Sequence, residues 1–68
     1  MQIPLSTLIG LQVALEPRAD SKFVGLCPFH EEKTPSFVVD DTKGTFHCFG
    51  CGADGDAQVF TLAMATLP

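Results

Sequence analysis

Three cysteines and one histidine form two pairs with the same internal spacing. Two residues separate Cys27 from His30, two separate Cys48 from Cys51, and 17 residues lie between the pairs. The two-residue spacing within each pair lets a tight turn direct both side chains of that pair at one ion. Thiolates and imidazole in a closed set of four match the tetrahedral preference of zinc. The sequence therefore predicts one structural Zn²⁺ bound by Cys27, His30, Cys48 and Cys51.

The predicted site is structural rather than catalytic. A closed set of four protein ligands leaves no open position for water, so we expect no hydrolysis at this metal. A chain of 68 residues buries little apolar surface, and domains of that size are often stabilised by a bound metal ion. Zinc binding in such domains contributes roughly 10–16 kcal/mol, more than the marginal stability of a bare chain. We therefore expect the metal-free chain to be largely unfolded.

Two other assignments of these side chains stay open. Cys48 and Cys51 alone have the spacing of a thioredoxin-like redox pair, but no βαβ pattern precedes them and glycines flank Cys51. His47 is a second candidate for the histidine ligand. Because His47 is adjacent to Cys48, a strand would direct it to the opposite face, so we favour His30.

The segment between the two pairs has the composition of a β-hairpin. Ser36–Asp40 is rich in β-branched and aromatic residues, which favour a strand. Asp41–Gly44 supplies turn residues, with Gly44 suited to a positive φ, and Thr45–Cys48 then returns beside the first strand. Such a hairpin brings the second ligand pair next to the first, which is the arrangement of a zinc ribbon.

The flanking segments predict the remaining elements. Pro4–Ile9 has apolar residues at helical spacing and predicts a short helical turn that ends at Gly10. Leu11–Leu15 alternates apolar and polar residues and predicts a strand, Pro17–Ser21 predicts a turn, and Lys22–Leu26 predicts a second strand.

The carboxyl-terminal segment predicts a helix. Either Asp54 or Asp56 is expected to cap it, and it runs to about Leu67. Its core-facing positions fall at i, i+3, i+4 and i+7 and are occupied by Phe60, Ala63, Met64 and Leu67. The expected fold over residues 1–68 is one small zinc ribbon, an antiparallel β-sheet with one C-terminal helix and a short N-terminal helical turn.

Charge and hydropathy narrow the function. Eight acidic residues against four basic ones give a net charge of −4, whereas a free-standing nucleic-acid-binding domain is usually basic. No segment resembles a membrane span or a secretory signal, because Pro4 and Gly10 interrupt the first apolar run. We therefore expect a cytoplasmic protein, in a reducing compartment where thiols stay available to bind metal.

The segment from Phe23 to Phe60 closely resembles the amino-terminal zinc-binding domain of bacterial and phage DNA primases of the DnaG type. The resemblance is carried by GLCPFHEEKTPSF at residues 25–37, FHCFGCG at residues 46–52, and then Gly55, Asp56 and Phe60. It implies a zinc ribbon that contacts single-stranded template DNA and helps to choose where an RNA primer starts. It also implies that nucleotidyl transfer belongs to a separate catalytic domain, so that this chain alone is no enzyme. The expected partners are template DNA, the primase catalytic domain and the replicative helicase.

Single-stranded DNA is bound through basic groups along the backbone and aromatic rings that stack on bases. Lys33 and Lys43 match basic positions in the family motif. The full set of candidate DNA contacts is Arg18, Lys22, Lys33, Lys43, Phe46, His47 and Phe49. The other rings, Phe29, Phe37 and Phe60, are expected in the core, and the acidic residues Glu31, Glu32, Asp40 and Asp41 are expected to form a solvated face.

An alternative function is open at this point. The chain is acidic, and its last predicted helix, residues 59–67, is apolar. Both features suit a primase-like ribbon that serves as a protein-interaction module and binds a helicase or a primase partner.

Overall fold

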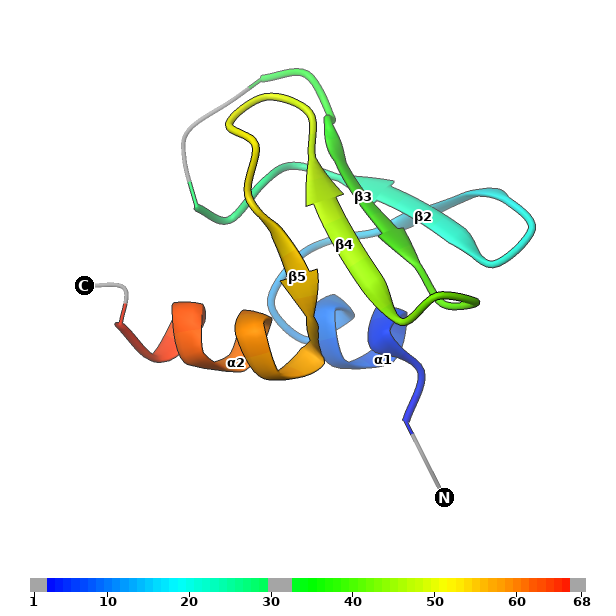
Figure 1. The fold of residues 1–68 in the computed structure, drawn as a ribbon. Coiled ribbons are helices and arrows are strands. Elements are labelled where there is room, and N and C mark those ends of the chain that lie inside the picture. Colours follow the sequence, from blue (N-terminus) through cyan, green and yellow to red (C-terminus); the bar gives the residue numbers. More distant parts are fainter. Residues whose placement is uncertain (1–2, 30–32, 67–68) are drawn as a thin grey trace.

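The computed structural model describes residues 3–29 and 33–66, which form one five-stranded antiparallel sheet and two helices. Neighbouring strands follow the chain order β1-β2-β3-β4-β5 without a crossover, and both helices lie at the same end of the sheet (Figure 1). The elements are α1 (Leu5–Gly10), β1 (Glu16–Ala19), β2 (Lys22–Gly25), β3 (Phe37–Asp40), β4 (Thr45–Cys48), β5 (Asp54–Asp56) and α2 (Ala57–Thr66). This architecture confirms the expected fold class.

Most of the predicted elements are confirmed. The β3–β4 hairpin pairs Phe37 with Cys48, and Gly44 in its turn has a φ of 67°. In α2, the backbone N–H of Val59 donates to Asp56 Oδ1 at 3.0 Å, so Asp56 is the capping residue. Phe60 is buried, and Ala63 and Met64 are half-buried on the same side of the helix. The predicted core position Leu67 lies outside the described residues.

The prediction of a strand at Leu11–Leu15 is wrong. This segment continues from α1 as a turn, in which the N–H of Val13 donates to the carbonyl of Ile9 at 2.9 Å. Val13 is buried in the core and Leu15 packs against it, while Leu11 is 77% exposed, so the alternation in sequence reflects a loop anchored by two side chains. The loop crosses β2 closely, since a Cβ at Gly25 would lie 2.6 Å from the carbonyl oxygen of Ala14.

The prediction of a turn at Pro17–Ser21 is wrong for most of its length. Residues 16–19 form β1, and only Asp20 and Ser21 make the turn into β2. Because β1 is an edge strand, Pro17 can lack a backbone N–H without breaking an interior ladder. The register is irregular between Pro17 and Ala19.

The fifth strand, β5, has no signal in the sequence, because aspartate and glycine are depleted in strands. Asp54, Gly55 and Asp56 pair with β4 residues His47, Phe46 and Thr45. This pairing follows from the turn at Cys48–Gly52, which reverses the chain, and it delivers α2 to the sheet.

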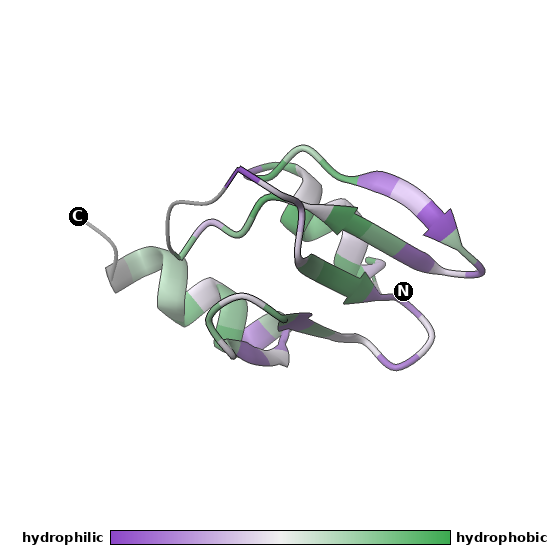
Figure 2. Ribbon diagram, turned by 90° about the horizontal axis from the view of Figure 1, so that it is seen from above, coloured by the Kyte–Doolittle hydropathy of each residue, from purple (hydrophilic) through white to green (hydrophobic). Residues whose placement is uncertain are grey.

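The core lies between the sheet and the helices. Inward-facing residues of the sheet, such as Val39 and Phe46, alternate with outward-facing ones. Four rings, Phe29, Phe37, Phe46 and Phe60, pack with centroid separations between 5.3 and 6.1 Å. Apolar colour runs through the middle strands and α2, whereas edge strand β1 is mainly polar (Figure 2). Among the described residues, neither helix has the length and apolar character that crossing a bilayer requires.

Candidate metal centre

The strand directions place the two cysteine-containing segments at one end of the sheet. Gly25 at the end of β2 pairs with Phe37, and Phe37 pairs with Cys48 at the end of β4. Cys27 follows β2 by two residues, so it emerges beside Cys48. Cys51 lies in the turn that leaves β4, where Gly52 has a φ of 81° and its N–H donates to the carbonyl of Cys48 at 2.8 Å.

The three cysteine sulfurs form one cluster. All three Sγ atoms lie within 4.8 Å of one another, and the sulfurs of Cys27 and Cys51 are 3.8 Å apart. Two thiolates bound to one tetrahedral zinc ion at about 2.3 Å have their sulfurs about 3.8 Å apart. None of these three cysteines is in a disulfide bond. The separation of the Cys27 and Cys51 sulfurs therefore matches that of two thiolates on a shared zinc ion, with the Cys48 sulfur close to both.

Backbone and side-chain donors surround the cluster. The N–H of Phe29 donates to the sulfur of Cys27 at 3.4 Å, and the Ser36 hydroxyl lies 3.6 Å from the sulfur of Cys48. Backbone N–H groups of Cys51 and Gly50 also donate to Cys48. Such donors orient metal-binding thiolates and stabilise their charge. Ser36 was not a sequence-based candidate, and its position directly before β3 gives no signal in the sequence for this role.

The surroundings of the two buried thiols shift their pKa values in opposite directions. Burial raises the pKa of Cys27 from an ordinary 9.0 to about 12. Burial alone would also raise the pKa of Cys48, but donors from Cys51, Ser36 and Gly50 lower it to about 7. Cys51 is exposed. A metal ion would supply the positive charge that lets all three ionise together.

The two histidines were the candidates for the fourth zinc ligand, and the structure describes only His47. His30, the predicted fourth ligand, lies outside the described residues, so its role stays a prediction. His47 lies on the outer face of β4, away from the sulfurs. Its ring packs against that of Phe49 with centroids 4.5 Å apart, and its Nδ1 lies 3.7 Å from Asp54 Oδ2.

Several of the candidate DNA contacts lie together on the outer face of the sheet. Lys22, Lys43, His47 and Phe49 line one shallow hollow of about 210 Å³, together with Val38, Asp40, Thr45 and Phe46. Phe49 is 73% exposed. Arg18 and Lys33 are also exposed but do not line this hollow.

Phe46 is a correction to the predicted set of contacts. Its ring is 3% exposed and packs against Phe37 with centroids 5.3 Å apart. Because β4 alternates its side chains, Phe46 points into the core while His47 points outward. A buried ring offers no face on which a base can stack, so Phe49 is the remaining aromatic candidate on this face.

Comparison with known proteins identifies relatives of this chain. Residues 1–67 match the family model described as CHC2 zinc finger, the zinc ribbon of DnaG. The DNA primase of Deinococcus radiodurans is 52% identical over 60 residues, which cover 88% of this chain and 10% of that protein. The DNA primase of Geobacillus stearothermophilus is 47% identical over 66 residues, which cover 97% of this chain and 11% of that protein.

A solved structure agrees with these matches. The crystal structure of the Aquifex aeolicus primase, comprising its zinc-binding and RNA polymerase domains, superimposes with a TM-score of 0.85 and 38% sequence identity. The similarity covers 97% of this chain and 16% of the Aquifex chain. The chain thus spans about a tenth of the length of the curated relatives it matches. With the sulfur cluster, the family match confirms the expected cofactor, one structural zinc ion.

Proposed function

Because the chain belongs to the CHC2 zinc finger family, the zinc-binding domain of DnaG-type DNA primases, we propose that it binds single-stranded template DNA and helps a primase to select where a primer starts. The proposal assigns two separate tasks to the domain. The end of the sheet at Cys27, Cys48 and Cys51 holds the metal, and the outer face holds the DNA. Nucleotidyl transfer belongs to a catalytic domain that is the partner of this one, with the replicative helicase as a further partner.

In this proposal the zinc ion is bound by Cys27, His30, Cys48 and Cys51 and has no catalytic task. It joins the loop after β2 to the turn after β4 and so fixes the end of the sheet. His47 and Phe49 lie directly on either side of Cys48 in sequence, and Lys43 lies at the other end of the same hairpin. Zinc binding therefore orders the segment that carries the DNA-binding side chains.

The observation that carries the DNA proposal is the shared hollow on the outer face. Lys22 and Lys43 supply cations for two phosphates, and exposed Phe49 supplies a ring on which a base can stack. The edge contact between His47 and Phe49 limits the orientations that the Phe49 ring can adopt. These residues come from β2, from the β3–β4 turn and from the end of β4, so the folded sheet is needed to bring them together.

The charges predict weak binding. Asp40 also lines the hollow, and its Oδ1 accepts hydrogen bonds from the N–H groups of Thr42 and Lys43 at 2.9 and 3.2 Å. Those bonds stabilise the turn that presents Lys43, but the carboxylate reduces the positive potential. Two lysine contacts to single-stranded phosphates give a salt slope of log K of only about −1.4. A tethered catalytic domain would then supplement the affinity through effective concentration.

The test is a titration of a fluorescent oligonucleotide with the zinc-loaded chain at low salt. We expect weak, salt-dependent binding, and each of Lys22→Ala and Lys43→Ala should flatten the salt slope by about 0.7. Phe49→Ala should weaken binding by about 1–3 kcal/mol with little change in slope. Thr42→Ala, a neutral change in the same turn, is the matched control. Absence of binding at high micromolar concentrations of zinc-loaded protein would overturn the proposal.

Lys33 and Arg18 stay predicted contacts that extend the surface beyond the hollow. If they bind flanking phosphates, Lys33→Ala and Arg18→Ala should flatten the slope for long oligonucleotides and leave binding of a trinucleotide unchanged. An equal loss with both lengths would contradict this arrangement.

A protein-binding role is favoured by a different observation, on α2. None of its ten residues is charged, and Val59 and Leu62 are 44% and 61% exposed. A helix without a charged face is usually covered by another surface. If this is the main function, Leu62→Gln should abolish association with a primase catalytic domain while oligonucleotide titrations show no binding to the unaltered chain.

A further inference from the structure

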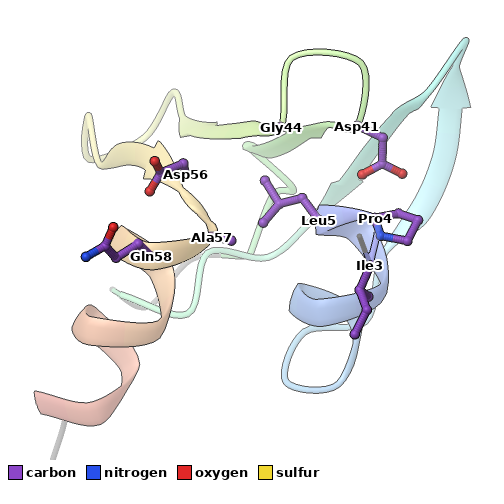
Figure 3. Close-up of a pocket in the computed structure, with 8 residues that line it drawn as sticks. All are labelled: Ile3, Pro4, Leu5, Asp41, Gly44, Asp56, Ala57 and Gln58. Carbon is purple, nitrogen blue, oxygen red and sulfur yellow. The ribbon is translucent and has the colours of Figure 1, made fainter. Parts of the chain in front are cut away.

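A second hollow, of about 560 Å³, lies between the start of α1 and the start of α2 (Figure 3). One side is formed by the amino-terminal residues 3–5, and the other by residues 56–58, with Asp41 and Gly44 of the β3–β4 turn completing it. None of the cysteines and none of the candidate DNA contacts lines it. The hollow is therefore independent of both surfaces described above.

Part of the wall of this hollow is apolar. Ile3, Pro4, Leu5 and Ala57 all contribute to it, and Leu5 points into the space between the two sides (Figure 3). Ile3 is 70% exposed. Apolar surface that lines a concave site is typical of a place where another molecule binds.

The rim of the hollow is acidic. Asp41 and Asp56 lie on opposite sides of it, and no lysine or arginine lines it (Figure 3). Among the described residues, neither carboxylate forms an ion pair with a basic side chain. Asp41 accepts one hydrogen bond on each oxygen from Ser6, and Asp56 accepts one from Val59. Because a carboxylate oxygen has two lone pairs, both groups can still accept a bond from a cation.

We propose that this hollow binds a protein segment that presents a lysine or arginine side chain next to an apolar one. The aliphatic part of such a segment covers the wall at Ile3 and Leu5, and its cationic end lies between Asp41 and Asp56. A volume of about 560 Å³ accommodates a few side chains rather than one ion. The two carboxylates also repel phosphate, so nucleic acid does not fit this surface.

A metal ion is the less suitable occupant. In the part of the chain that the structure describes, the one group of three or more metal-binding side chains is the cysteine cluster. Asp41 and Asp56 stand alone on opposite sides of the hollow, and hard cations such as Ca²⁺ need six or more oxygen ligands. Charge complementarity to an organic cation carries the assignment.

The test uses the zinc-loaded, ¹⁵N-labelled chain and three synthetic peptides, acetyl-Leu-Arg-Leu-amide and the same peptide with glutamine or glutamate in place of arginine. We expect the arginine peptide to shift the amide signals of Leu5, Gly44 and Ala57 saturably. The glutamine peptide should bind about tenfold more weakly, and the glutamate peptide should cause no shift. Equal shifts with all three peptides, or no shift with the arginine peptide, would overturn the proposal.

Two substitutions that each replace one aspartate by asparagine, one at the rim of the hollow and one away from it, test whether the rim charge matters. Asp56→Asn removes one rim charge but keeps a residue that caps helices well, so the fold is preserved. This substitution should weaken binding of the arginine peptide roughly two- to fivefold. Asp20→Asn, in the exposed β1–β2 turn, is the matched control and should have no effect. If MgCl₂ alone or an oligonucleotide saturably shifts the same amides, the occupant is an ion or nucleic acid and the proposal is wrong.

Discussion

Asp41 in the β3–β4 turn binds Ser6 in the first turn of α1, 35 residues earlier in the chain. Its Oδ1 accepts the backbone N–H of Ser6 at 2.7 Å, and its Oδ2 accepts the Ser6 hydroxyl at 2.6 Å. Pro4, at the N-cap position, has no side-chain acceptor, so Asp41 provides the cap from a distant segment. A residue expected in a solvated acidic face thus joins α1 to the hairpin.

Asp41→Ala should therefore destabilise the folded domain. Loss of both hydrogen bonds leaves the Ser6 N–H without its acceptor, which costs about 1–2 kcal/mol. Urea denaturation at a fixed free zinc concentration measures the change. Asp20→Ala, an exposed aspartate in another turn, is the control and should change the free energy of unfolding by less than about 0.5 kcal/mol. Equal effects of the two substitutions would contradict the capping role.

Removal of zinc should unfold most of the domain. The sulfur cluster joins the ends of β2 and β4, and without a metal Cys27 and Cys48 must bury thiols that no longer hold a common ion. Addition of a strong chelator should abolish the near-ultraviolet circular dichroism of the phenylalanines, and a stoichiometric addition of Zn²⁺ should restore it. A native spectrum in the chelated protein would show that the apolar core alone is sufficient.

Substitution of the two histidines should distinguish the fourth ligand. His30→Ala removes a predicted metal ligand, and we expect zinc affinity to fall by more than about 100-fold. His47→Ala should leave zinc affinity unchanged, because His47 contacts Phe49 and Asp54 on the outer face. Competition with a chromophoric chelator measures both affinities. The reverse result would make His47 the ligand.

Zinc affinity should fall as the pH is lowered, because protons compete with the metal for thiolates. If the metal-free chain is unfolded, Cys27 and Cys48 have an ordinary pKa of 9.0, so each must lose a proton when zinc binds. Each then contributes about one decade per pH unit to the fall in zinc affinity as the pH is lowered from about 8 to 7. If the metal-free chain stays folded, hydrogen bonds hold the pKa of Cys48 at about 7. Cys48 is then ionised above that pH, and the slope decreases by about one. Chelator competition across this range measures the slope.

Gly55→Ala should destabilise the junction between β5 and α2. Gly55 has a φ of 153°, and a Cβ there would lie 2.5 Å from Cγ1 of Val59. The strain and the steric clash together cost about 1–3 kcal/mol. Gly10→Ala is the control, because a Cβ at Gly10 meets nothing within 4 Å and alanine favours a helix. Similar urea midpoints for the two variants would contradict this explanation.

Local sequence patterns predicted the elements whose residues have strong conformational preferences. The β-branched and aromatic residues of Phe37–Asp40 favour a strand, Gly44 accepts a positive φ, and the pattern at Phe60 places one face of a helix in the core. The two pairs Cys27–His30 and Cys48–Cys51 indicated a zinc site because metal-ligand spacing is a local property of the chain.

The parts that depend on contacts between distant residues were not predictable in this way. The strand β5 exists because the turn after Cys48 returns Asp54–Asp56 to β4, although those residues disfavour a strand. The alternation at Leu11–Leu15 resembles a strand, but the packing of Val13 beside α1 makes it a loop.

The sequence by itself determined that this is a small zinc-binding domain of the primase type, since ligand identity and spacing are written along the chain. Only the tertiary structure decided which side chains face solvent together. It buried Phe46, placed Lys22 beside Lys43 and Phe49, and set Asp41 against Ser6. The physical reason is that strand register and helix docking, which no local preference encodes, decide which distant residues become neighbours.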